Sequence, residues 1–256
     1  MCLIVFAWRP GHPQPLVLAA NRDEFHARRC LPLGEWEESP GLHAGRDLQA
    51  GGTWMGVTAA GRFAAVTNIR DPHQRKGERS RGELPADFLR SDLQAADYLQ
   101  RLLPRLGEYN GFNLLLGDRQ ALYFLNSQAR QIRRLEAGIY GVSNANLDTP
   151  WPKLQRAKAA LAATLDDPQP QRLFKLLADP TPAADADLPD TGIGLAGERL
   201  LSSVFIHSPG YGTRASSVLL IDEHGMQISE RSFDSNGRPC GDVVLRLEQT
   251  PLRTCL

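Results

Sequence analysis

The second residue of the chain is a cysteine, placed where one residue can supply both a nucleophile and its own base. Because Met1 precedes the small residue Cys2, we expect an aminopeptidase to remove Met1 and leave Cys2 as the mature N-terminus. The α-amino group and the thiol of such a residue have ordinary pKa values within about one unit of each other. The amine can then accept the thiol proton at neutral pH and activate the sulfur. Judged by position alone, a buried cysteine that begins a strand is the simpler interpretation.

Four polar residues directly follow a short apolar run: Asn21, Arg22, Asp23 and Glu24. If the run 16–20 is a strand, the first and third members of this tetrad face one side and the second and fourth face the other. A tight turn would pair this strand with 2–8 and bring the tetrad beside Cys2. There an arginine would lower the thiol pKa, and a carboxylate would hold the terminal ammonium. A solvated turn with local ion pairs is the alternative.

Three further residues are candidates for the same site. Asn68 and Asn144 each stand at the end of a predicted strand, where an amide can donate a hydrogen bond to an oxyanion. Asparagine is equally at home in turns, so neither position decides the matter alone. Arg214 leads into an apolar strand and is a candidate contact for an anion or a carbonyl, with a solvated loop arginine as an equal alternative. The charged segment 71–83 and its flank are interpreted as a solvated loop, with a lid over an acidic ligand as the alternative; their cations are Arg70, Arg75, Lys76, Arg79 and Arg81.

The remaining chemistry-bearing residues predict neither a metal nor a cofactor. The six histidines contain no pair at metal-ligand spacing. The glycine pairs lack both a P-loop lysine and the strand–glycine–helix context of a dinucleotide site. The four cysteines contain no CxxC pair, so reduced thiols are expected; they are Cys2, Cys30, Cys240 and Cys255.

Charge and hydropathy exclude several classes of function. Lys plus Arg and Asp plus Glu both number 29, so the net charge is zero and nucleic acid is not an expected partner. The apolar run 2–8 is too short to span a bilayer and lacks the features of a secretory signal. We therefore expect a cytoplasmic protein without a transmembrane segment that binds a small-molecule ligand. The oligomeric state stays open.

The elements that must position these residues alternate between strands and helices. Apolar runs predict strands at 2–8, 16–20, 54–58 and 62–68, then a meander of strands at 112–116, 121–126, 132–135 and 139–143, and finally strands at 204–207, 215–221, 226–233 and 243–247. A polar loop is predicted at 24–50. A capping box at Ser91 and a proline at Pro152 mark two helical blocks. This order favours an α+β fold of two antiparallel sheets with helices outside, as one domain over 1–256.

Together these motifs resemble the NRDE family, the family of the Transport and Golgi organisation protein 2. The resemblance spans essentially the whole chain and rests on motifs in a fixed order: Cys2, Asn21-Arg22-Asp23-Glu24, Gly51-Gly52-Thr53-Trp54, Thr67-Asn68, the segment 142–152, and Gly212-Thr213-Arg214. This family is similar to N-terminal-nucleophile hydrolases. The resemblance therefore implies a four-layer αββα sandwich.

The resemblance also implies roles for the site residues, by analogy with penicillin V acylase and bile salt hydrolase. Cys2 would be the nucleophile, the two asparagines would serve the oxyanion and position the base, and Arg214 would match a late arginine. Contacts to the ligand would come from Asn21, Trp54 and Thr67. The acylases separate their arginine and aspartate by two residues, whereas Arg22 and Asp23 are adjacent. Either Glu24 does the aspartate's work or Asn21 replaces the arginine.

Two functions remain open at this point. The first is hydrolysis of a non-peptide C–N amide bond by Cys2. The second is binding and trafficking of haem or lipid on the same fold, because the resemblance implies a link to haem mobilisation and lipid homeostasis. Cys2, His26 or His43 would then meet an iron.

Overall fold

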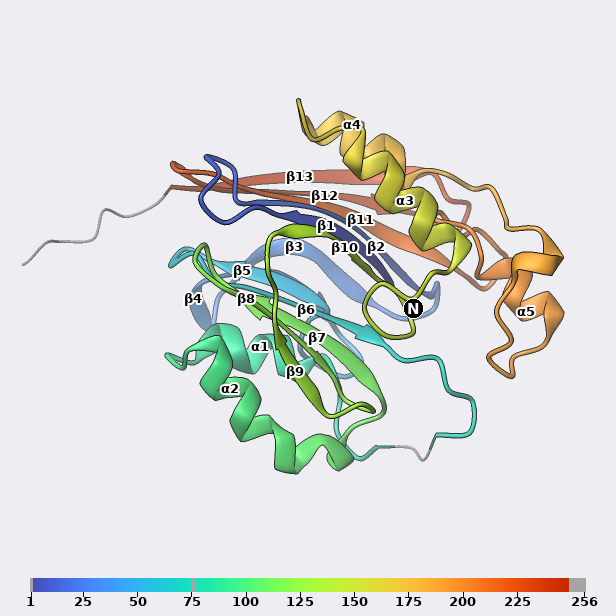
Figure 1. Ribbon diagram of the computed structural model, residues 1–256, viewed down its shortest axis with the longest axis horizontal. Coiled ribbons are helices and arrows are strands. Elements are labelled where there is room, and N and C mark those ends of the chain that lie inside the picture. Colours follow the sequence, from blue (N-terminus) through green and yellow to red (C-terminus); the bar gives the residue numbers. More distant parts are fainter. Residues whose placement is uncertain (1, 75–76, 249–256) are drawn as a thin grey trace, which may run out of the picture.

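Two antiparallel sheets face each other across an apolar interior in the computed structural model, which describes residues 2–74 and 77–248 (Figure 1). Sheet A has six strands, in the spatial order β10 (Gly138–Val142), β1 (Cys2–Trp8), β2 (Leu16–Phe25), β11 (Tyr211–Ile221), β12 (Gly225–Phe233) and β13 (Pro239–Glu248). Sheet B has seven, in the order β3 (Cys30–Trp36), β4 (Ser39–Asp47), β5 (Met55–Thr58), β6 (Phe63–Asn68), β7 (Phe112–Gly117), β8 (Leu122–Asn126) and β9 (Gln131–Arg134).

Strand β1 shows why the sheets are covered on both faces. All seven of its residues are buried. Alternate side chains point to opposite sides of a sheet, so Ile4 and Phe6 pack between the two sheets while Leu3 and Val5 pack under the helices. A strand with two apolar faces is stable only when both are covered.

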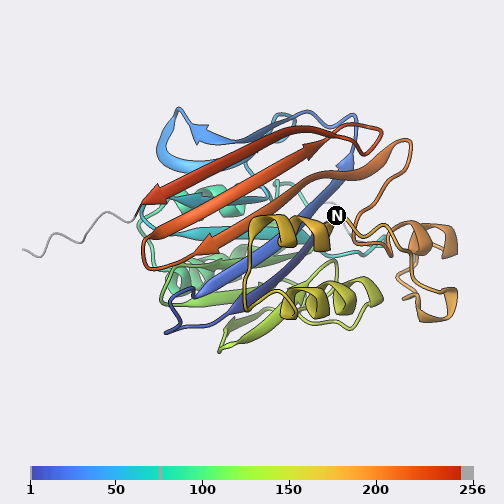
Figure 2. The same cartoon turned by 90° about the horizontal axis from the view of Figure 1, so that it is seen from above.

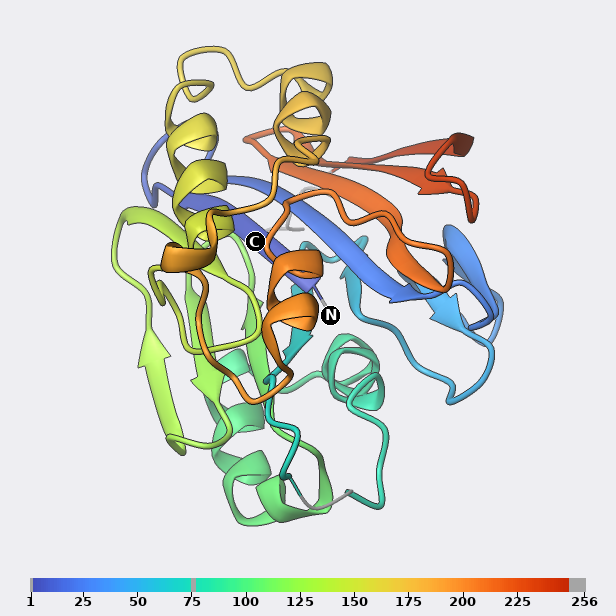
Figure 3. The same ribbon diagram turned by 90° about the vertical axis from the view of Figure 1, so that its right-hand side faces the viewer.

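Helices supply the two outer layers (Figures 1 and 3). Helices α3 (Pro152–Ala162) and α4 (Pro170–Leu177) pack on sheet A, and α1 (Glu83–Arg90) and α2 (Ala95–Leu102) pack on sheet B. Figure 2 shows α3 and α4 over one half of sheet A, with the outer face of β12 and β13 left without a helix. The shorter helices are η1 (Leu103–Glu108), η2 (Asp185–Asp187) and α5 (Leu195–Leu200). The predicted α+β fold with layers in the order αββα is confirmed.

The segment 24–50, predicted as a polar loop, instead contains the end of β2 and the β3–β4 hairpin. Within β3 and β4 only four apolar side chains are buried, namely Leu33, Trp36, Leu42 and Ala44. Such sparse apolar alternation gives little signal in the sequence. Backbone pairing of β4 with β5 holds the hairpin in sheet B.

Three smaller predictions were also wrong. Ser91 ends α1 rather than starting a helix, and its hydroxyl donates to the Phe88 carbonyl at 2.9 Å. Strand β10 leaves the predicted meander and pairs with β1 in the other sheet, because periodicity within a strand does not specify its partner. No strand forms at 204–207, where the Ile206 N–H donates to the Thr213 hydroxyl instead of to a strand carbonyl.

Among residues 2–74 and 77–248, no helix has the length and apolar character needed to cross a membrane.

Candidate active site

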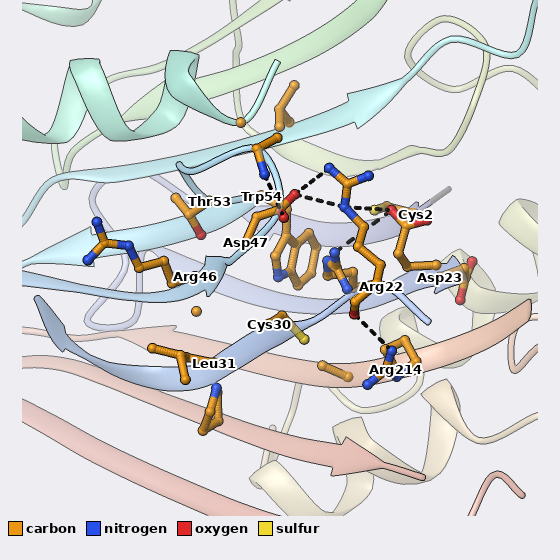
Figure 4. Close-up of a pocket in the computed structure, with 18 of the residues that line it drawn as sticks. Cys2, Arg22, Asp23, Cys30, Leu31, Arg46, Asp47, Thr53, Trp54 and Arg214 are labelled. Atoms are coloured by element: carbon orange, nitrogen blue, oxygen red, sulfur yellow. Dashed lines mark hydrogen bonds and ion pairs between the residues drawn. The ribbon is translucent and has the colours of Figure 1, made fainter. Parts of the chain in front are cut away.

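A cavity of about 770 Å³ opens at the end of the sandwich where β1 begins (Figure 4). Both sheets and the loops between them contribute to its walls. The candidate residues that line it are Cys2, Arg22, Asp23, Glu24, Trp54, Asn68 and Arg214. In sheet A, Cys2 lies opposite Arg22, Arg22 opposite Ala215, and Ala215 opposite Ser232. One transverse row of four strands therefore forms the wall that carries the sulfur.

Cys2 is held firmly at the first position of β1. Only 7% of the residue is exposed. The Ser143 hydroxyl donates to its carbonyl at 3.0 Å, and the backbone N–H of Asp23 donates to its sulfur. Burial raises the pKa of the Cys2 thiol, while the charge of Arg22 acts to lower it. Met1 lies outside the described residues, so its removal stays a prediction.

Arg22 and Glu24 share the cavity side of β2, as the predicted alternation requires. Arg22 Nη2 lies 3.8 Å from Glu24 Oε2, and Glu24 Oε2 is also 3.8 Å from Arg28 Nε. Arg28 in turn donates two hydrogen bonds to Asp47 Oδ2, from Nε at 2.8 Å and from Nη2 at 2.6 Å. The buried Arg22 Nη1 has no hydrogen-bond partner among the residues that the structure describes.

Asp23 projects to the other side of β2, away from its two neighbours. It is only 1% exposed, and the Thr213 hydroxyl donates to its Oδ1 at 2.7 Å. The Tyr211 hydroxyl donates to its backbone carbonyl at 3.0 Å. Burial raises the pKa of the Asp23 carboxyl, and the charge of Lys153 is the strongest opposing influence. The position of Arg22 opposite Cys2, with Asp23 behind, settles the register of the tetrad.

Asn21 and Thr67 lie outside the cavity lining. Asn21 Nδ2 donates to the carbonyls of Leu177 and Val204, both at 2.9 Å, and its Oδ1 accepts from Ser216 at 2.6 Å. The Thr67 hydroxyl accepts from Asn113 Nδ2 at 3.1 Å. Both side chains join neighbouring segments of the fold, and the structure does not bring them to the other candidates.

Asn68 and Asn144 are connected to each other. Asn144 Nδ2 donates to the Asn68 carbonyl at 2.8 Å, and Ser143 links Asn144 Oδ1, at 3.2 Å, to the Cys2 carbonyl. Asn68 lines the cavity and Asn144 stands behind it. Because the Ile69 N–H donates to the carbonyl of Gly111, just before β7, the alternation of an antiparallel ladder turns the Asn68 N–H away from β7.

The Gly-Gly-Thr-Trp motif brings Trp54 and Arg81 to the cavity. Gly52 has φ +74°, a left-handed conformation that favours glycine, and the Thr53 N–H donates to the Gly82 carbonyl at 2.8 Å. This contact holds Arg81, whose Nη1 donates to the Gly111 carbonyl at 3.1 Å, in the cavity wall. Burial lowers the pKa of Arg81, and Cys2 is the strongest opposing influence. The segment 71–83 thus contributes a cation near the sulfur; Arg75 and Lys76 lie outside the described residues.

Arg214 occupies a bulge in β11, where the pairing with β2 shifts register between Thr213 and Ala215. Its Nη1 donates to the carbonyls of Phe25, His26 and Arg28 at 3.2, 3.0 and 3.3 Å. Figure 4 shows it on the same side of the cavity as Arg22. Arg214 therefore holds the β2–β3 turn in place as well as bordering the cavity.

Two buried charged residues were missed by the sequence analysis. Glu230 lines the cavity, accepts from the Leu33 N–H at 2.7 Å, and has a pKa raised by burial. Lys153 is buried in the first turn of α3. A signal existed for Lys153, because a cation in the first turn of a helix opposes the helix dipole. Glu230 lies in a strand of mixed polarity, so the sequence offered no signal that its side chain would be buried.

Two of the remaining cysteines line the cavity, whereas the two histidines considered as iron ligands do not. Cys30 and Cys240 border it, as Cys2 does, and Cys255 lies outside the described residues. His26 and His43 are absent from the described lining. The arrangement therefore does not fit a haem held by either histidine.

Comparison with known proteins agrees with this geometry. A family model described as Transport and Golgi organisation 2 matches residues 1–235. The Transport and Golgi organization protein 2 homologs of Bos taurus and Homo sapiens are 35% and 34% identical, each match covering 91% of this chain and 93% of the relative. Two solved structures of a conjugated bile acid hydrolase from Clostridium perfringens, both variants, match with a TM-score of 0.55 and 7% identity. These matches cover 96% and 95% of this chain and 92% of the other chain. The fold is thus similar to that of N-terminal-nucleophile hydrolases such as this bile acid hydrolase, and the chain belongs to the Transport and Golgi organisation 2 family.

Proposed function

We propose that this protein is an N-terminal cysteine amidohydrolase that cleaves a non-peptide C–N amide bond of a small molecule. One observation carries the proposal. Cys2, the residue that removal of Met1 would expose, begins β1 in the wall of a cavity of about 770 Å³, opposite Arg22. The volume lies in the range of small-molecule sites.

The reaction begins when the α-amine of the processed Cys2 takes the thiol proton and the sulfur attacks the amide carbon. The C–N bond of the tetrahedral intermediate then breaks, and the leaving amine departs with the proton from the α-ammonium. Water adds to the thioester with the same amine as base, which releases the acid and restores the thiol. The α-amine of Cys2 thus takes the proton that the thiol or the water loses and passes it to the group that leaves in the same half of the reaction.

The surrounding side chains support this chemistry in distinct ways. Arg22 favours the thiolate from across the ladder, against the effect of burial. The Asn68 N–H and the Asn144 amide are candidates for the oxyanion, since their connected segments end beside Cys2. The backbone N–H of Asp23 donates to the sulfur, and the Asp23 carboxylate would hold the terminal amine in this proposal.

A second candidate is binding of an apolar or amphipathic ligand without hydrolysis. The burial of Cys2, which raises the pKa of its thiol, favours this alternative because a thiolate is the reactive form. For haem in particular, the residues fit poorly, because the described lining contains cysteines but neither of the candidate histidines.

Intact mass spectrometry tests the proposed function directly. We expect the native protein to lack Met1 and to be alkylated once, rapidly, at pH 7, and a Cys2→Ala variant to lose that modification. Cys30 and Cys240 border the same cavity, so Cys30→Ala and Cys240→Ala variants are matched controls that keep the fast reaction. A panel of small N-acyl amides then measures turnover. Retention of Met1, or a Cys2 no faster than the other thiols, would make ligand binding the leading function.

A further inference from the structure

Lys153 lies on the side of α3 that packs against sheet A. Together with Ala157 and Leu161 it forms a buried stripe at helical spacing. Only 2% of Lys153 is exposed, and its Nζ has no hydrogen-bond partner among the described residues. A buried ammonium is costly unless another charge compensates it, and a position in the first helical turn adds an unfavourable dipole. Packing of α3 alone gives no reason for a lysine here.

Asp23 lies in the same layer, between sheet A and the helices. Arg22 faces the cavity, so its neighbour Asp23 points to the helix side of β2. Burial lowers the pKa of Lys153 to about 8, and Asp23 is the strongest charge that opposes this. Conversely, burial raises the pKa of Asp23, and Lys153 is the strongest charge that opposes that. Each residue is thus the main counter-charge of the other.

The other charged groups around Lys153 are already paired. Arg70, from the segment after β6, contacts Glu198 of α5 at 2.6 Å, and both side chains are about 5% exposed or less. Glu198 also accepts from the Thr191 N–H at 2.8 Å. Cys2 also acts on Lys153, while the terminal amine, Arg22 and Tyr211 act on Asp23. The charges of Arg70 and Glu198 cancel each other, so Asp23 is the main counter-charge of Lys153.

Lys153 has no room to bind a substrate of its own. The space beside it, which Arg70 and Glu198 also border, is about 10 Å³, and a single water needs about as much. Lys153 is not among the residues that line the large cavity. Lys153 therefore does not touch a ligand in that cavity, and it acts on Cys2 through its own charge and through Asp23.

We propose that Lys153 is a positioning residue of the Cys2 site: its ammonium keeps the buried Asp23 ionised, and Asp23 thereby stays bonded to Thr213 while its backbone N–H holds the Cys2 sulfur. The role at Cys2 rests on the proposed function, whereas the pairing with Asp23 does not. Without Lys153, the pKa of Asp23 rises further, because burial then acts without its strongest opposing charge. The pH dependence of Cys2 would then contain an ionisation that the wild type lacks.

Lysine-selective NMR tests the pairing in the intact protein. The sequence has four lysines, Lys76, Lys153, Lys158 and Lys175, so carbon-13 labelled lysine gives a simple spectrum. We expect one signal to titrate well below the others, to vanish in Lys153→Met, and to stay in the matched helix variant Lys158→Met. In Asp23→Asn this signal should titrate lower by about one unit or more. The pairing would be overturned if all four lysine signals titrated together, or if the Asp23→Asn substitution left the pKa of the Lys153 signal unchanged. Both measurements can be made without a folded Lys153→Met variant.

The rate of Cys2 alkylation as a function of pH tests the positioning role. We expect Lys158→Met and Asp23→Asn to show as many ionisations as the wild type, in which the thiol and the α-amine of Cys2 titrate. Lys153→Met should show one more ionisation, which the double variant Lys153→Met/Asp23→Asn removes. A merely structural lysine would lower the melting temperature and leave the number of ionisations unchanged, which would overturn the role. If wild-type Cys2 reacts no faster than Cys30 and Cys240, the proposed function fails, and the lysine titration still decides the pairing.

Discussion

Gly52 and Gly82 approach each other so closely that a Cβ on Gly52 would stand 2.3 Å from the Gly82 carbonyl oxygen. This contact joins the loop before β5 to the turn that carries Arg81 into the cavity. The two backbones can meet only where no side chain separates them.

The first prediction concerns this contact. Gly52→Ala combines a left-handed φ with a backbone clash, so it should destabilise the fold by about 2 kcal/mol or more. Gly51 also has a left-handed φ, but a Cβ there meets nothing within 4 Å. Gly51→Ala should therefore cost only about 1 kcal/mol. Urea unfolding of both variants measures the difference, and equal losses would show that strain alone matters at this loop.

Arg22 is predicted to control the reactivity of the sulfur. Arg22→Met removes the cation opposite Cys2, so the thiol pKa should rise by about one unit and alkylation at pH 7 should slow about tenfold. Arg46→Met, at a more distant part of the same lining, is the control. Stopped-flow alkylation measures both. An unchanged rate in Arg22→Met would remove Arg22 from the mechanism.

Asn21 is predicted to act on stability rather than on ligand binding. Asn21→Leu leaves the carbonyls of Leu177 and Val204 without their donor, which should cost about 3 kcal/mol. Because the side chain lies outside the lining, alkylation of Cys2 in the folded fraction should keep its wild-type rate. Chemical unfolding and alkylation of the same sample separate the two effects. A stable variant with an altered Cys2 rate would restore Asn21 to the site.

Glu230 gives a prediction for pH. Burial raises its pKa in the folded state above the ordinary value, so the folded protein binds this proton more tightly than the unfolded chain. The stabilising effect is complete below pH about 4 and is lost as the pH rises through the folded pKa. Relative to Glu230→Gln, the wild type should lose stability as the pH increases above about 5. Unfolding free energies of both proteins, measured between pH 4 and 8, test this prediction. Parallel curves of unfolding free energy against pH for the two proteins would contradict it.

The sequence was sufficient for those parts of the site that depend on local periodicity. Apolar runs and the turn after Trp8 predicted the β1–β2 hairpin, and the hairpin places Arg22 opposite Cys2. Two antiparallel sheets with helices outside followed from the order of strands and helices along the chain, and the family resemblance implied the four-layer αββα arrangement.

What the sequence did not predict depends on contacts between distant segments. Asn21 and Asp23 face the helix layer because β2 is buried on both sides, and the tetrad alone cannot show what covers that face. Lys153 is about 130 positions from Asp23, and only the packing of α3 on sheet A brings the two charges into one layer. Strands β3 and β4 form through backbone pairing, which leaves little trace in residue type.

The position of Trp54 gives the cavity an optical reporter. Its indole is half-buried in the cavity wall, whereas Trp8 and Trp36 are shielded in the cores and Trp151 lies under the Arg70 guanidinium, 4.7 Å from the ring. A ligand that enters the cavity removes water from Trp54, whereas the described lining contains none of the other three tryptophans. Its arrival should therefore shift the intrinsic fluorescence of the protein toward the blue, without any label and before any bond is broken.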